Sequence, residues 1–192
     1  MPRRPRIVVP GGVYHVFSRG NRRQEIHVDA VDRVWFLERL EQVVGAFGWL
    51  LHAYCLMPNH YHLVLETPEP NLSAGMHRLN FLTAQSFNRR HDVDGHLFQG
   101  RFRSPLVTTD PHLVELSRYV VLNPVRARLV RHPADWRWSS YRATVGLVAR
   151  PPFLTLDRVL SYFGRDGDEA MREYGAFVAA GVPRAAGTTL AA

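Results

Sequence analysis

Residues 49–66 read WLLHAYCLMPNHYHLVLE, two apolar segments on either side of Pro58 and Asn59. β-Branched and aromatic residues favour strands and a Pro-Asn pair favours a turn, so we predict a hairpin of strands 49–57 and 61–66. Successive side chains of a strand point to opposite faces of the sheet. The imidazoles of His60 and His62, two positions apart, are therefore expected on the same face.

The spacing of apolar residues assigns the other elements. Apolar positions three and four apart predict helices, and alternation predicts strands. The predicted order is strand 13–18, helix 29–47, the hairpin, a helix from 71 or 73 to about 90, strand 106–109 and a helix from about 111 to 123. The first six elements match the ferredoxin-like split β-α-β arrangement, an antiparallel sheet with two helices on one face. We predict an α+β fold of this kind with one added helix, a topology that supports many functions and identifies none.

The length of 192 residues is in the usual range of a single domain. We assign residues 1–145 to the main domain, residues 146–182 to a helical C-terminal extension and residues 183–192 to a disordered tail. No apolar run approaches the ~20 residues that span a bilayer, and the first residues lack the apolar stretch of a signal peptide. We therefore expect a cytoplasmic protein with no membrane partner.

The net charge of +7 comes from arginine alone, because all 24 basic side chains are Arg. A guanidinium can engage two phosphate oxygens at once, so this excess favours a polyanion, with nucleic acid first. An organism that replaces Lys by Arg throughout would explain the missing lysines but not the net excess. The single cysteine, Cys55, excludes an internal disulfide and a cysteine-rich metal site, and we expect it to be a core residue.

Two residue pairs could carry chemistry. His60 and His62 have the spacing of a metal-binding pair, but two ordinary histidines would look the same. Tyr119 and Asn123 are four positions apart in the predicted last helix, which places a phenol and a carboxamide on one face. The alternative for this pair is a core aromatic and a residue that ends the helix before Pro124.

The predicted topology brings the two pairs together. A helix after the fourth strand can lie across the sheet face that the first two helices leave open. Two imidazoles and an amide oxygen suit Mn²⁺ well and Mg²⁺ acceptably, with water and a phosphate oxygen as further ligands. Such a cation would polarise a phosphate, and Tyr119 would attack its phosphorus.

Five motifs resemble the REP-associated tyrosine transposases, which belong to the HUH superfamily of single-strand nucleases. The resemblance extends from about Pro10 to Tyr141. The motifs are residues 11–21 (GGVYHVFSRGN), 56–65 (LMPNHYHLVL), 95–102 (GHLFQGRF), 118–127 (RYVVLNPVRA) and 138–141 (WSSY).

The resemblance implies the roles of the four residues. His60 and His62 would be the two histidines of the HUH motif, Asn123 the third metal ligand and Tyr119 the single catalytic tyrosine. Tyr119 would form a 5′-phosphotyrosine link and leave a free 3′-hydroxyl. The cofactor would be Mg²⁺ or Mn²⁺.

The resemblance also implies a partner and a location. The partner would be single-stranded or hairpin DNA from repeated palindromes of a bacterial chromosome, so the protein would associate with the nucleoid as a monomer or homodimer. Two positions depart from the family pattern: Arg128 stands where Gly is expected, and His27 where an aromatic residue is common.

Clusters of arginine occur in the segments next to the predicted strands and helices, and they could contact phosphates. Phe98 and Phe102 could either stack on unpaired bases or belong to the core. The candidate DNA-binding residues are Arg19, Arg22, Arg23, Arg89, Arg90, Arg101, Arg103 and Arg126.

Two other functions stay open. One is a non-catalytic, single-stranded nucleic-acid-binding regulator of the same fold. The other is a nuclease that activates water on a metal, which would need carboxylates near the histidines. Glu66 is the nearest candidate and by alternation shares their face.

Overall fold

The computed structural model describes residues 8–183, so nearly all of the expected tail, from residue 184 on, lies outside the described residues. The sheet consists of β1 (Gly12–Arg19), β2 (Leu50–Leu56), β3 (His60–Thr67) and β4 (Leu106–Val107). The longer helices are α1 (Ala30–Phe47), α2 (Leu72–His91), α3 (Asp110–Val121) and α7 (Gly167–Ala180). The short helical turns are η1 (Asn21–Arg23), α4 (Asn123–Arg126), η2 (Pro133–Asp135), α5 (Tyr141–Thr144) and α6 (Asp157–Leu160).

The ends of α1 are those that its sequence specifies. The Asp29 carboxylate accepts hydrogen bonds from the backbone N–H groups of Val31 and Asp32, which would otherwise be unpaired in the first turn. At the other end Gly48 adopts a left-handed conformation, φ 64°, that glycine tolerates best. Capping at both ends explains why this helix was predicted almost to the residue.

The four strands form an antiparallel sheet in the order β2-β3-β1-β4. This is the strand order of the ferredoxin-like arrangement, so the predicted fold class is confirmed. In the central pair, Phe17 lies opposite His62 and Arg19 opposite His60. The start of β3 is therefore next to the end of β1.

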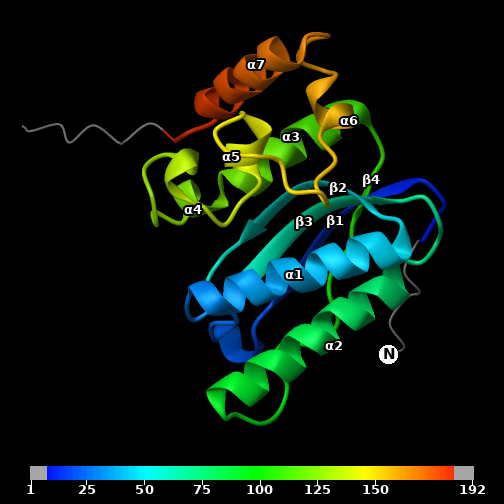
Figure 1. Cartoon of the computed structure of the whole chain (residues 1–192), viewed down its shortest axis with the longest axis vertical. Coiled ribbons are helices and arrows are strands. Elements are labelled where there is room, and N and C mark those ends of the chain that lie inside the picture. The colour runs from blue at the N-terminus through cyan, green and yellow to red at the C-terminus, as the bar shows by residue number, and fades with distance from the viewer. Residues whose placement is uncertain (1–7, 184–192) are drawn as a thin grey trace, which may run out of the picture.

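Helices cover both faces of the sheet. α1 and α2 lie on one side, while α3 to α7 lie on the other (Figure 1). Tyr61 shows which face is which: its ring contacts Phe36 of α1 and its hydroxyl donates to Asn80 of α2. His60 and His62 consequently face the layer that contains α3.

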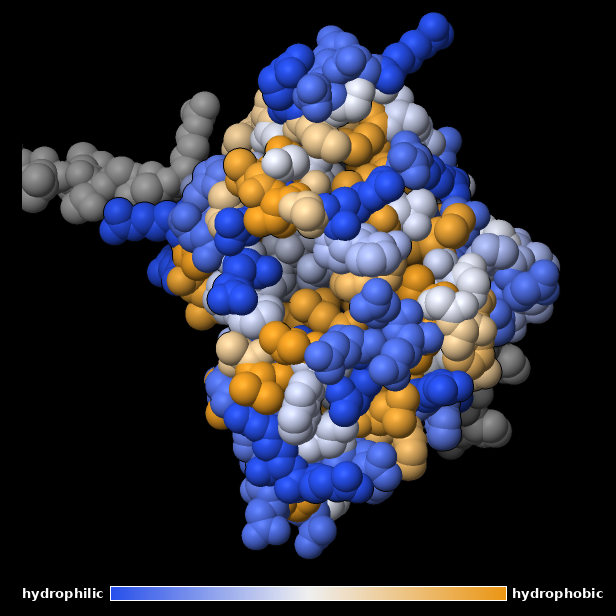
Figure 2. Space-filling model, viewed as in Figure 1, coloured by the Kyte–Doolittle hydropathy of each residue, from blue (hydrophilic) through white to orange (hydrophobic). Residues whose placement is uncertain are grey.

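The layer that contains α1 and α2 ends in a polar surface. Hydrophilic residues gather at the end of α2 that is lowest in the view of Figure 2, where Arg89, Arg90 and His91 form the last turn. No helix within residues 8–183 is long and apolar enough to cross a membrane.

The end of α3 differs from the prediction. The helix ends at Val121 rather than at Asn123, and after Leu122 the chain enters the new helical turn α4. Pro124 causes no break because it occupies the first turn of α4, where its missing N–H is not needed. The four-residue relation survives, since the Asn123 amide donates to the carbonyl of Tyr119.

The chain after α4 packs back onto the α3 side of the sheet. The Arg158 side chain of α6 donates to Glu66 of β3 at 2.6 Å and to Asp110 of α3 at 3.3 Å. The segment 146–182, expected to be helical, contains α6 and α7. Cys55 is buried in the core as expected.

The backbone conformation at residue 128 explains why the family pattern has glycine at this position. Arg128 has φ 58° just after α4, and the N–H groups of Arg128 and Leu129 bond back to the carbonyls of Val125 and Pro124. This is the Schellman arrangement, in which the position held by Arg128 is usually glycine because a Cβ is strained there.

We expect Arg128→Gly to raise the free energy of unfolding by about 0.5–1 kcal/mol and Tm by about 2 °C, since it relieves the left-handed strain. Thermal denaturation measures the change. Arg128→Ala is the matched control, because it removes the same side chain but keeps the Cβ. An equal gain in both variants would assign the effect to the charge and contradict the backbone explanation.

Candidate active site

The two histidines of β3 lie at the edge of an open cleft of about 1050 Å³. Their rings meet edge to face with centroids 5.0 Å apart. His62 is buried, whereas His60 is partly exposed. Both side chains line the cleft, as the alternation of the strand predicted.

His15 of β1 is a third imidazole at the site. Its Nε2 lies 2.9 Å from Nδ1 of His62, and the two rings stack with centroids 5.1 Å apart. The sequence provided no partner for His15, because its neighbour depends on the pairing of β1 with β3. Within its own strand, the sequence indicates only that His15 shares a face with Phe17, two positions later.

Tyr119 reaches the same cleft from α3. Its ring lies edge-on to both His62 and His15, with centroids 5.9 Å apart in each case. The residue is 39% exposed and lines the cleft, where a substrate can reach it. The Arg126 guanidinium lies 4.9 Å from the centre of the Tyr119 ring.

Asn123 lines the cleft beside Tyr119. Its amide nitrogen donates to the carbonyls of Tyr119 and Val120, at 3.0 and 3.2 Å. These bonds fix the nitrogen end of the carboxamide on the helix, which leaves the oxygen as the atom for a ligand. The structure thus brings together the four residues that the sequence singled out.

Burial keeps the imidazoles neutral. It lowers the pKa of His60 and of His15 to about 4, with smaller contributions from the Arg19 and His112 charges respectively. Burial and the neighbouring His60 and His15 hold the pKa of His62 well below its usual value. Neutral imidazole is the form that binds metals. One ring of the His15–His62 pair uses its lone pair in their hydrogen bond, so at pH 7 two imidazole lone pairs are left for a ligand.

The donor set suits a divalent cation only in part. Within residues 8–183, no three His, Cys, Asp or Glu side chains are grouped so that they could hold a metal ion. The remaining set is two imidazole nitrogens and the Asn123 carboxamide oxygen, which suits Mn²⁺ or Mg²⁺ if water and phosphate oxygens complete the shell.

The candidate arginines separate into two groups. Arg19, Arg101, Arg103 and Arg126 line the cleft and are exposed. Arg22 and Arg23 are exposed in η1, next to the cleft residue Arg19 in sequence, and Arg89 and Arg90 lie at the end of α2. Phe98 and Phe102 are both buried, which favours the core over base stacking.

Glu66 lies far from the histidines. It is six positions after His60 on β3, about 20 Å along the strand. Its carboxylate pairs with Arg158 at 2.6 Å and lies 3.5 Å from His52. Glu66 is therefore committed to a structural ion pair.

The sequence from residue 9 to 123 matches the profile of one protein family, described as "Transposase IS200 like". The chain belongs to the IS200-like transposase family. The matched range includes β1, the paired histidines, Tyr119 and Asn123.

One named protein and one solved structure are similar to the chain. A Haemophilus influenzae protein with the name REP-associated tyrosine transposase is 28% identical in an alignment of 105 residues that covers 48% of this chain and 59% of the relative. The chain therefore matches less than two thirds of that relative's length. A solved structure of a REP-associated tyrosine transposase bound to a REP hairpin superposes with a TM-score of 0.66, at 18% identity, over 82% of this chain and 93% of the other. The resemblance to REP-associated tyrosine transposases is confirmed.

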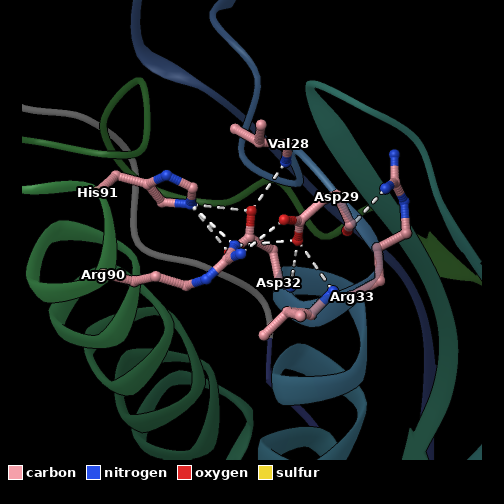
Figure 3. Close-up of polar contacts among 7 residues, drawn as sticks. Val28, Asp29, Asp32, Arg33, Arg90 and His91 are labelled. Atoms are coloured by element: carbon pink, nitrogen blue, oxygen red, sulfur yellow. Dashed lines mark hydrogen bonds and ion pairs between the residues drawn. The ribbon is translucent and has the colours of Figure 1, made fainter.

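Outside the cleft, Arg90 serves the packing of α1 against α2. Its guanidinium pairs with Asp29 at 2.5 Å and with Asp32 at 2.6 Å, and His91 also contacts Asp32 (Figure 3). The Arg90 hydrogen bond lowers the pKa of Asp29 to about 2. Arg90 is thus paired with carboxylates and does not line the cleft as Arg19, Arg101, Arg103 and Arg126 do.

We expect Arg90→Ala to lower the Tm by a few degrees at pH 7, because Asp29 loses its charged partner and Asp32 is left with His91 alone. The pKa of Asp29 is depressed in the folded state, so its stabilising effect is present above about pH 4 and disappears as pH falls toward 2. The difference in Tm between variant and wild type should shrink over that interval.

Arg89→Ala is the matched control for the Arg90 experiment. It removes the same charge from the adjacent, exposed position. Its Tm should stay at the wild-type value. An equal loss from both variants would show that overall charge, and not the pairing of Arg90, is the cause.

Proposed function

We propose that this transposase cuts and rejoins single DNA strands at hairpin-forming palindromes, with Tyr119 as the nucleophile. The observation that carries the proposal is the edge-on contact of the Tyr119 ring with His62 in one cleft, at 5.9 Å. The Tyr119 phenol meets a histidine pair with the spacing of metal ligands, in a cleft lined by arginines. Tyr119 and His62 are 57 positions apart in the sequence.

The reaction is a transesterification. The Tyr119 oxygen attacks the phosphorus of the scissile phosphodiester and the bond to the 3′-oxygen breaks, which leaves a 5′-phosphotyrosine and a free 3′-hydroxyl. The number of phosphoester bonds is unchanged, so rejoining with another 3′-hydroxyl needs no external energy source. The Arg126 guanidinium over the ring would stabilise the negative charge of the phenolate.

His60, His62 and Asn123 would hold Mg²⁺ or Mn²⁺. The bound cation would supply electrophilic polarisation of the scissile phosphate. The neutral state of both imidazoles and the free oxygen end of the Asn123 carboxamide support this role.

The arginines of the cleft would bind the DNA backbone. Arg19, Arg101 and Arg103 are exposed around a cleft that also contains Tyr119. A solved relative has a REP hairpin bound, which supports hairpin DNA as the substrate class. Arg22, Arg23 and Arg89 stay candidates for contacts outside the cleft.

The main alternative is a regulator that binds nucleic acid without cutting it. Phe98 and Phe102 are buried, which disfavours these two rings as the stacking surface that such a binder would use. The other alternative, a nuclease that activates water on a metal, would need a carboxylate near the histidines. Glu66, the nearest candidate, is paired with Arg158 instead.

Tyr119→Phe should abolish the covalent protein–DNA adduct and reduce nicking by at least a thousandfold, while the affinity for hairpin DNA stays within about twofold. Labelled hairpins from the DNA around the gene, incubated with Mn²⁺, would reveal the adduct on denaturing gels. The matched control is Tyr162→Phe, because Tyr162 is similarly exposed, at 45%, but does not line the cleft. Full adduct formation by the Tyr119 variant would exclude it as the nucleophile.

Arg101→Ala and Arg103→Ala should weaken hairpin binding and make it less dependent on salt. Each lost phosphate contact lowers the slope of log affinity against log salt by about 0.7–0.9. Fluorescence anisotropy at several salt concentrations gives the slopes. Arg165→Ala, an exposed arginine that does not line the cleft, should keep the wild-type slope, and equal slopes in all variants would argue against the cleft as the binding surface.

A further inference from the structure

The turn between β2 and β3 contains a carboxamide with two partners. Oδ1 of Asn59 lies 2.6 Å from Nδ1 of His60, and Nδ2 of Asn59 donates to the backbone carbonyl of Arg23 at 3.1 Å. One side chain therefore joins a proposed metal ligand to the loop that contains η1.

The partner on the loop determines the orientation of the amide. A backbone carbonyl can only accept a hydrogen bond, so the end of Asn59 near Arg23 must be the NH₂ group. The oxygen end then faces His60. Because that oxygen can only accept, Nδ1 of His60 must carry the hydrogen, and in a neutral ring Nε2 is left with the lone pair.

Backbone hydrogen bonds fix the turn that contains Asn59 against the loop that contains η1. Gly20 donates to the carbonyl of Asn59 at 2.8 Å, and the N–H groups of Ile26 and His27 both donate to the carbonyl of Pro58. A Cβ at Gly20 would lie 2.1 Å from the carbonyl oxygen of Gln24, so this close wrapping of the loop around the turn requires glycine.

We infer that Asn59 is a positioning residue that holds His60 in the Nδ1–H tautomer, with Nε2 free to bind the cation, and that it anchors the loop of Arg22 and Arg23 to the same site. Asn59 takes no part in the making or breaking of a bond. The inference rests on the proposed metal role of His60. A ligating histidine commonly has its second nitrogen fixed in this way, and loss of such a partner weakens metal binding by about 10–100-fold.

Two variants separate the two ends of the carboxamide. Asn59→Asp keeps an acceptor for His60 but loses the donor to the Arg23 carbonyl, whereas Asn59→Ala loses both. Asn88→Ala is the matched control, because Asn88 donates to the Gly95 carbonyl and does not line the cleft.

The first measurement is the tautomer of His60 in metal-free protein, from the ¹⁵N shifts of its ring at neutral pH. Wild type, Asn59→Asp and Asn88→Ala should have Nδ1–H, and Asn59→Ala should shift toward Nε2–H. An Nε2–H ring in the wild type would overturn the inference without any variant.

The second measurement is Mn²⁺ affinity by calorimetry, with His60→Ala as the variant that lacks the ligand. Asn59→Ala should bind about 10–100-fold more weakly than wild type, while Asn59→Asp should bind at least as tightly. Wild-type affinity in Asn59→Ala, together with an unchanged tautomer, would refute the role of Asn59. If neither wild type nor His60→Ala binds Mn²⁺, the metal site itself is wrong, and the tautomer still shows whether Asn59 orients the ring.

Discussion

The site depends on the two-residue alternation of β3 between two helical layers. Tyr61 is held on one face by Phe36 and by the hydrogen bond to Asn80, and this contact fixes His60 and His62 on the other. A shift of one residue in the pairing of β3 with β1 would move both imidazoles into the apolar layer under α1 and α2. The buried Tyr61 between the histidines therefore determines where the chemistry lies.

Much of this could be predicted because it is local. Alternation gave the face of the histidines, helical spacing gave Tyr119 and Asn123, and caps gave the ends of α1. The rest depends on contacts between distant positions. His15 meets His62 only through strand pairing across 47 positions, and Arg90 meets its aspartates across about 60. Neither contact leaves a pattern within either segment.

The composition favours a polyanionic partner but does not indicate the role of any individual arginine. All 24 basic residues are chemically alike, and their roles are set by what lies within reach of each guanidinium. Arg90 and Arg158 are held by carboxylates, Arg126 lies over the Tyr119 ring, and Arg101 and Arg103 face an open cleft. The arginines held by carboxylates are less available for phosphate, because a paired guanidinium must first give up its carboxylate.

The helix that presents Tyr119 is also supported from outside the part of the chain that matches the family. Neighbouring residues on a helix point about 100° apart, so Arg118 faces away from the cleft that Tyr119 enters. Its guanidinium lies 4.2 Å from the centre of the Phe177 ring of α7 and bonds to the Phe177 carbonyl. Arg158 of α6 holds the first residue of the same helix. The segment after residue 123 thus contacts α3 on the side away from the cleft. The position of the Tyr119 phenol over the sheet therefore depends on α6 and α7 as well as on the strands.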